Sequence, residues 1–339
     1  MKVDFLGSAE YVGTEAFKDC VSLTEISLPK GIEDVKNSVF YGCSNLTTVH
    51  IPEGVKTIEA SAFYNCKKLS EVVIPEGVKK IDTRAFYECD FAEINIPSTL
   101  TELGANAFQY CDKLEKVNIT DIGAWCNVKF YDATSNPLSN AALYLDGLKV
   151  EDLVISSGVT TIMDHAFSGY ADLKSIRFSD DLTTIYSGAF SNCHNLKEVH
   201  FGRGISFVVT NAFLDCDSIT SVHYAGSEAE WEDVLFGAGN ESIISKDVKF
   251  GVFTKTLLSN SSDAEYVYTI TATDAPVGCI IVFVCYDGNT VAHLDVKEYA
   301  GSALTVEVDK TIDFDSIKVL TWDNPQTMNQ LCNAEFPAV

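Results

Sequence analysis

Cysteine is the most chemically versatile residue of this 339-residue chain, which contains eleven of them. Thiols form disulfides, bind zinc or act as nucleophiles, according to their spacing and surroundings. Seven of the cysteines share one context, because each follows a phenylalanine by three residues. They are Cys20, Cys43, Cys66, Cys89, Cys111, Cys193 and Cys216, and Tyr170 occupies the equivalent position once. This regularity indicates one repeated structural position.

The geometry of that position limits its chemistry. Equivalent residues of a repeat stack on neighbouring strands about 4.8 Å apart, with nearly parallel Cα–Cβ bonds. A disulfide requires Cβ atoms about 3.8 Å apart that face each other, and structural zinc requires ligands that converge tetrahedrally. The series therefore predicts free, buried thiols that behave as small hydrophobic residues.

Two further cysteines, Cys279 and Cys285, lie on one face of a single predicted strand, about 20 Å apart by the rise of an extended chain. At that separation they do not pair with each other. Either of them can pair with Cys332, and the sequence leaves both pairings open.

Histidine and carboxylate side chains form the second group with chemical potential. His200 and His223 are 23 residues apart, one period of the sequence, and Glu198 precedes His200 by two residues. The three side chains are expected on one face, where such a cluster can hold zinc or respond to pH. Histidines also gather by chance on a polar face, and this interpretation is favoured. We therefore predict no metal site and no cofactor.

Motifs typical of catalysis do not occur in the sequence. It has no Gly-x-Ser-x-Gly, no His-Glu-x-x-His and no phosphate-binding loop. No pair of carboxylates stands out by its spacing. We predict that the protein is not an enzyme. The remote alternative is a hydrolase that acts on glycans in an acidic concave face.

The element that must position these side chains is a repeat built on the phrase Ala-Phe-x-x-Cys-x-x-Leu. Its phenylalanines are Phe17, Phe40, Phe63, Phe86, Phe108, Phe167, Phe190 and Phe213. They are separated by 23, 23, 23, 22, 59, 23 and 23 residues. A fixed period in this range is typical of a solenoid, in which each repeat buries its apolar face against its neighbours.

Residues 46–66 show the pattern of a single repeat. Val49 and Ile51 alternate with polar His50, as in a half-buried strand. The segment Pro52–Gly54 then turns the chain, and a second apolar stretch leads to the cysteine. Each repeat is expected to contain one strand, one turn and an irregular or short helical return. Successive strands are expected to lie parallel.

The pattern Leu-x-x-Val/Ile-x-Ile-Pro-x-Gly-Val-x-x-Ile-x-x-x-Ala-Phe-x-x-Cys resembles the BspA-like leucine-rich repeats of bacterial surface proteins. The resemblance covers about residues 1–252. It implies a cell-surface or secreted protein that binds other macromolecules and is not an enzyme. The predicted fold class of this domain is an α/β-type leucine-rich-repeat solenoid of period 22–23, with a parallel β-sheet on its concave face.

Outward side chains of the predicted strands are the candidate binding residues. The central outward position is occupied by Asp4, Ser27, His50, Val73, Asn95, Asn118, Val154, Arg177, His200 and His223, and the preceding outward position by Glu25, Thr48, Glu71, Glu93, Lys116, Asp152, Ser175, Glu198 and Ser221. This surface is polar, partly acidic and without an aromatic stripe. From it we select Glu25, His50, Glu71, Glu93, Asn95, Asn118, Arg177, Glu198, His200 and His223 as binding residues.

Two places depart from the regular period. An expanded repeat at about residues 120–150 is interpreted as a structural elaboration, with Trp125 and Tyr144 packed in a small core of their own, as in many BspA-like repeats. The alternative is a protruding loop that contributes to binding. The array is expected to end with a helical turn near residue 230, a last strand at 248–250 and Trp231 over the open core.

Both ends of the sequence carry further expectations. The chain begins within a repeat, so we expect the natural protein to be longer at this end; neither a signal peptide nor a membrane span is visible. Residues 253–339 contain no repeat but several short strands rich in β-branched residues, which predict a small all-β immunoglobulin-like sandwich.

The overall charge limits the class of partner. The chain has 24 basic and 48 acidic residues, a net charge of −24, which repels nucleic acid and anionic membranes. We predict a monomeric, extracellular or cell-surface adhesion module that binds a protein or glycan, and in particular a host or matrix protein, on its concave face. The alternative is a structural spacer within a larger cell-surface protein.

Overall fold

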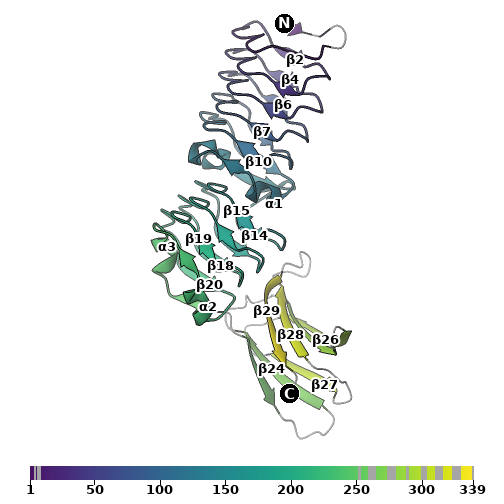
Figure 1. Cartoon of the computed structure of the whole chain (residues 1–339), viewed down its shortest axis with the longest axis vertical. Coiled ribbons are helices and arrows are strands. Elements are labelled where there is room, and N and C mark those ends of the chain that lie inside the picture. The colour runs from purple at the N-terminus through teal and green to yellow at the C-terminus, as the bar shows by residue number, and fades with distance from the viewer. Residues whose placement is uncertain are drawn as a thin grey trace.

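The computed structural model describes residues 1–3, 5 and 9–250, together with seven strands within residues 253–337 (Figure 1). Residues up to 250 form a stack of turns that follows the long axis of the molecule, from the purple N-terminal end to green. In the described part of the chain, no helix is long and apolar enough to cross a membrane. The solenoid predicted from the period is confirmed.

The first strand of each turn pairs in parallel with its neighbours, as the sequence predicts. Val49 lies opposite Ile26 on one side and Val72 on the other, and all three are buried. We call these the ladder strands. They are β1 (Lys2–Val3), β2 (Glu25–Ser27), β4 (Thr48–His50), β6 (Glu71–Val73), β8 (Glu93–Asn95), β10 (Lys116–Ile119), β12 (Ala142–Leu145), β14 (Asp152–Ile155), β16 (Ser175–Phe178), β18 (Glu198–Phe201), β20 (Ser221–Tyr224) and β22 (Val248–Phe250).

The ladder strands form three sheets, which divide after β6 and after β12. The first division coincides with the 22-residue repeat, in which buried Phe91 takes the place of leucine one residue early. At the second division, β12 turns back through Asp146-Gly147 into the antiparallel strand β13 (Leu148–Lys149). Both turn residues have positive φ, 49° and 80°, which glycine and aspartate tolerate in a two-residue hairpin.

A second strand in each turn was not predicted. It has two residues and forms two further parallel sheets on the return side. In the type repeat, Ile58 of this strand is buried and lies opposite Val35 and Ile81. The strands are β3 (Asp34–Val35), β5 (Thr57–Ile58), β7 (Lys80–Ile81), β9 (Glu102–Leu103), β11 (Lys129–Phe130), β15 (Thr161–Ile162), β17 (Thr184–Ile185), β19 (Phe207–Val208) and β21 (Leu235–Phe236).

The rest of each turn is the irregular form of the predicted return. Ser61 and Asn65 of the type repeat have φ of 55° and 59°, in the left-handed region. Their N–H groups point along the stack, from Ser61 to the Thr83 carbonyl (3.0 Å) and from Asn65 to the Tyr87 carbonyl (2.8 Å). The backbone polar groups of the return are thus satisfied by the next repeat.

The core contains a stack of phenylalanine rings and a parallel stack of thiols. Ring centroids from Phe40 to Phe63 and from Phe63 to Phe86 are 5.3 and 5.1 Å apart. The Cys66 thiol donates to the Phe40 carbonyl (3.1 Å), and the same bond recurs for Cys43, Cys89, Cys111, Cys193 and Cys216. All seven cysteines of the series are free, six buried and Cys20 half-buried, so the sequence prediction is confirmed except at the first turn.

Two tryptophan-containing units interrupt and end the array. The first has helix α1 (Ile122–Cys126), β11, the 3-10 helices η1 (Ala133–Ser135) and η2 (Pro137–Ser139), and β12; the second has α2 (Glu228–Glu232), β21, α3 (Glu241–Ile244) and β22. Each unit adds a strand to the ladder and a strand to the second sheet. The helical turn, the last strand and Trp231 against the core are as predicted.

The interpretation of the expanded repeat needs correction. Trp125 does not pack in a separate small core, because it is 2% exposed within the continuous core of the array, and its Nε1 donates to the Ala166 carbonyl (2.9 Å). Tyr144 belongs to no core, since β12 places it beside Asn118 in the ladder. The segment is one turn of the solenoid, lengthened to 26 residues between ladder strands, and not a protruding loop.

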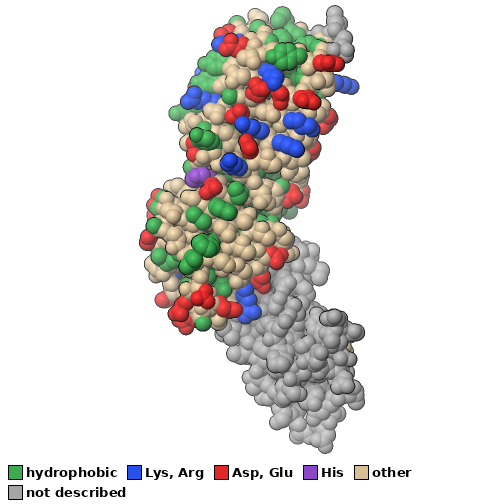
Figure 2. Space-filling view, in the orientation of Figure 1, with side chains coloured by type: hydrophobic (Ala, Val, Ile, Leu, Met, Phe, Trp, Pro, Cys, Tyr) green, Lys and Arg blue, Asp and Glu red, His purple; other side chains and the backbone are tan. Residues whose placement is uncertain are grey.

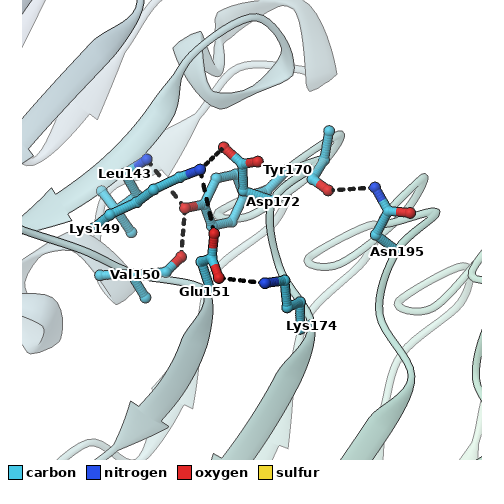
Figure 3. A network of polar contacts seen from close by, with 9 residues as sticks. Leu143, Lys149, Val150, Glu151, Tyr170, Asp172, Lys174 and Asn195 are labelled. Atoms are coloured by element: carbon cyan, nitrogen blue, oxygen red, sulfur yellow. Dashed lines mark hydrogen bonds and ion pairs between the residues drawn. The ribbon is translucent and has the colours of Figure 1, made fainter.

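Tyr170 joins the expanded repeat to the following turns (Figure 3). Its hydroxyl accepts from the Leu143 N–H (3.2 Å) and donates to the Val150 carbonyl. Above it, Lys149 pairs with Asp172 (3.1 Å). The position that elsewhere holds a thiol is thus occupied by a side chain long enough to reach both partners across the division between sheets.

Beyond residue 250, the described strands form two antiparallel sheets. One contains β23 (Phe253–Leu258), β24 (Glu265–Ala272) and β27 (Leu304–Asp309); the other contains β25 (Ile280–Asp287), β26 (Thr290–Glu298), β28 (Ser316–Trp322) and β29 (Gln330–Pro337). All-β structure is as predicted. Cys285 is buried, whereas the side chains of Cys279 and Cys332 lie outside the described residues, so the pairing of Cys332 with Cys279 or Cys285 stays a prediction.

Candidate functional site

The outward side chains of the ladder strands form one surface, which we call the ladder face. Strand register places them in two rows. All ten residues predicted for binding lie on this face, and Asp4 lies outside the described residues. The first row is Ser27, His50, Val73, Asn95, Asn118, Tyr144, Val154, Arg177, His200, His223 and Lys249; the second is Glu25, Thr48, Glu71, Glu93, Lys116, Ala142, Asp152, Ser175, Glu198 and Ser221.

Two members of the first row are not predicted by the 22–23-residue period. Tyr144 lies opposite Asn118, and Lys249 lies opposite His223. Both belong to the tryptophan units, where the spacing between ladder strands is 26 residues, so a search at 22–23 residues passes over them. The detectable signal is the shared series of helix cap, Trp, Val and Phe in residues 121–130 and 227–236.

The N-terminal third of the ladder face is acidic. Glu25 pairs with Lys2 (2.7 Å), and the hydrogen bond from Lys2 lowers the pKa of this exposed carboxyl. Glu71 accepts from the Thr48 hydroxyl (3.3 Å). Figure 2 shows both signs of charge interspersed over the visible side of the N-terminal half. The acidic ladder positions are accessible to a basic partner.

The centre of the ladder face combines apolar, amide and aromatic groups. Val73 is 65% exposed, which is unusual for a valine in a sheet that has a buried face of its own. Asn95 and Asn118 are in register on β8 and β10, and the Lys116 ammonium lies over the Tyr144 ring, 5.5 Å from its centroid. Exposed aromatic and aliphatic groups among amides are typical of protein-binding surfaces.

The C-terminal third brings Glu198, His200 and His223 together, as the sequence predicts. The two imidazole rings are stacked with centroids 4.1 Å apart and planes 8° apart. His200 Nε2 lies 2.6 Å and His223 Nε2 lies 3.4 Å from the same Glu198 oxygen. Burial lowers the pKa of His200 to about 4, and the hydrogen bonds from both histidines hold the pKa of Glu198 well below its usual value.

One further predicted residue, Arg177, borders this cluster, with Nη1 3.4 Å from His200 Nδ1. His50 has Ser27 and Val73 as its row neighbours, so it stands apart from the other two ladder histidines. The ladder face therefore has three regions of different chemistry and one compact polar cluster.

Comparison with known proteins places the array in a family of repeats. The family model described as BspA type leucine rich repeat region, in 6 copies, matches residues 1–121 and 139–255. No curated protein matches the chain.

Several solved structures are similar to the array. A leucine-rich repeat protein from Bacteroides ovatus is 21% identical, with 71% of this chain and 78% of that chain covered and a TM-score of 0.34. A leucine rich cell surface protein from Faecalibacterium prausnitzii is 22% identical, with 66% and 71% covered and a TM-score of 0.31. The leucine rich repeat protein of T. pallidum is 22% identical, with 70% and 78% covered and a TM-score of 0.27.

Proposed function

Because the chain belongs to the BspA-type leucine-rich-repeat family, we propose that it is a non-enzymatic interaction module of the bacterial cell surface. The ladder face is the proposed binding surface, and a protein is the proposed partner. Host or matrix proteins are the first class to test. Residues 1–252 form the proposed binding domain, and residues 253–339, an immunoglobulin-like sandwich in this proposal, act as its spacer in a monomer.

One observation carries the proposal: the ladder positions differ from turn to turn while the inward positions repeat. Ala, Phe and Cys recur along the core, where they pack against one another and the thiols donate hydrogen bonds. The outward positions of the same strands hold acids, amides, histidines, a valine and a tyrosine. Packing does not constrain the outward positions, so they are free to vary, and this freedom lets a repeat array present a surface suited to a partner of irregular shape.

A structural spacer is the second candidate. It is favoured by the backbone hydrogen bonds of the array, in which N–H groups of one turn donate to carbonyls of the next along the described repeats. Such a stack can hold its two ends apart without any ligand. The two candidates differ in what mutation of the ladder face does, so one set of variants separates them.

The charge of the N-terminal third gives the first test. We expect the variant Glu71→Lys/Glu93→Lys to lower the affinity for a basic protein partner about tenfold, since two attractive charges become repulsive across the contact. The partner is first selected from an array of purified matrix proteins and glycans, and affinities are measured by surface plasmon resonance. Glu53→Lys is the control, because Glu53 is exposed in the turn that follows β4 and is not an outward residue of a ladder strand. Equal affinities of all variants would favour the spacer.

A further inference from the structure

We propose that Glu198, His200 and His223 bind one divalent transition-metal ion, and that zinc is the ion best matched to them. They offer one carboxylate oxygen and two imidazole nitrogens, and these atoms lie within 4.8 Å of one another. Two histidines and one carboxylate form a common ligand set for zinc, which leaves a fourth position open. The sequence favoured chance placement of the histidines; the convergence of the three side chains is what the structure adds.

One of the ligand spacings already equals that around a bound ion. Two ligands of one tetrahedral zinc lie about 3.3 Å apart, given metal–ligand bonds of about 2.0–2.2 Å. The distance of 3.4 Å between His223 Nε2 and the Glu198 oxygen already matches this spacing. The 2.6 Å contact between His200 Nε2 and the same oxygen must lengthen. Glu198 allows this movement, because its side chain is 42% exposed and the strand backbone need not change.

The neighbouring strands hold the two histidines in place. His200 on β18 and His223 on β20 are direct partners in the parallel register, and their rings are stacked. Their side chains are only 16% and 12% exposed, so few other rotamers are open to them. An ion therefore meets two ligands that are already ordered, which reduces the entropy lost on binding.

The types of ligand also suit a cation. A metal ligand must be a neutral imidazole or an ionised carboxylate, and the cluster supplies two imidazoles and one carboxylate. His223 Nδ1 is buried without a hydrogen-bond partner, so the hydrogen bonds of this ring involve Nε2 alone. The net charge of −24 adds a general attraction for cations.

Two polar neighbours tune the site. Ser221 Oγ lies 2.8 Å from His223 Nε2 and can turn its hydroxyl toward a water molecule on the ion. Arg177 Nη1 lies 3.4 Å from His200 Nδ1, where a ligating histidine prefers an acceptor for its N–H. Binding requires the half-buried guanidinium to turn away, so Arg177 lowers the affinity without removing a ligand.

The chain supplies its own control. Among the described residues, Glu198, His200 and His223 are the one group of three potential ligands this close together. His50 occupies the same row of the ladder face, but its neighbours are Ser27 and Val73. Replacing His50 removes a ladder histidine and leaves the proposed ligands unchanged.

The test is titration of the chelator-treated full chain with zinc chloride at neutral pH by calorimetry, repeated with cobalt to record the absorption spectrum. We expect one ion per chain and a tetrahedral cobalt spectrum with nitrogen and oxygen ligands. His200→Gln and His223→Gln should each weaken binding about tenfold or more, while His50→Gln should match the unmodified chain. Thermal unfolding without metal shows which variants are folded, and Glu198→Gln replaces any histidine variant that is not.

Three results would overturn the proposal. They are the absence of zinc binding by the unmodified chain, an unchanged affinity in the folded ligand variants, and a cobalt spectrum with thiolate charge transfer, which would place the ion on cysteine. None of these results bears on partner binding by the rest of the ladder face, because the titration contains no partner.

Discussion

Single residues of the core are fixed by hydrogen bonding as well as by apolar packing. The cysteine of each turn is small enough to stack at the repeat spacing, and its S–H donates to the phenylalanine carbonyl of the preceding turn. Alanine would lose that bond and leave the space of the sulfur atom empty. Burial raises the pKa of Cys43 and of Cys111 to about 12, so these thiols are inert where a thiolate is required.

This account of the thiols predicts their reactivity. In the native chain, iodoacetamide at mildly alkaline pH should label Cys20 well before Cys66 or Cys89, because Cys20 is half-buried at the first turn and the other two are fully buried. Peptide mass spectrometry after timed quenching measures each site. Labelling of Cys66 at the rate of Cys20, in protein that retains its native circular dichroism, would show that the stack is open.

Among the secondary-structure elements, buried asparagines take the place of a missing turn in the rows of hydrogen bonds that connect successive turns. In regular turns, the N–H of the core phenylalanine donates to the next turn. The last phenylalanine, Phe213, donates instead to Asn240 Oδ1 (3.0 Å), and Asn240 Nδ2 donates to the Val209 and Gly237 carbonyls. Asn136 of the first tryptophan unit acts in the opposite direction, because its amide donates to the His165 and Ala166 carbonyls of the following turn.

The cap at the end of the array gives a stability prediction. Asn240→Ala should lower the free energy of unfolding by about 3 kcal/mol, since it leaves buried backbone groups without partners. Asn195→Ala is the control: Asn195 is exposed and donates one hydrogen bond, to the Ala171 carbonyl, so its loss should cost about 1 kcal/mol or less. Urea unfolding of both variants compares the two, and equal effects would show that Asn240 is not a cap.

Periodicity predicts the ladder strands, the inward residues and the thiol stack, because each depends only on local alternation and a fixed repeat. The two-residue strands of the return are not predicted, since a strand with a single inward residue, such as Ile58, shows no alternation of apolar and polar residues. The sequence predicts Tyr144 in a small core of the expanded repeat, whereas the register of β12 with β10 places it beside Asn118 on the ladder face. The proximity of His200 and His223 was predicted, but their common approach to one oxygen depends on side-chain rotamers.

For the whole molecule, the structure separates a repetitive interior from a varied surface. The outward positions of the turns lie on three sheets, and the expanded repeat contributes β12 to the middle one. That repeat brings an aromatic ring, Tyr144, to the middle of the face, near exposed Val73 and the Asn95–Asn118 pair. A protein partner that spans the face should therefore bury Tyr144 near the centre of the contact.

The affinity of a matrix-protein partner for Tyr144→Ala, compared with that for Tyr131→Ala, tests the central claim most directly. Both tyrosines are replaced by the same residue, but Tyr131 is 75% exposed just after β11, away from the ladder strands. We predict that surface plasmon resonance shows a loss of about tenfold or more for Tyr144→Ala, as expected for a central aromatic contact, and no change for Tyr131→Ala. Unchanged affinity in Tyr144→Ala, or an equal loss in both variants, would contradict binding by the ladder face.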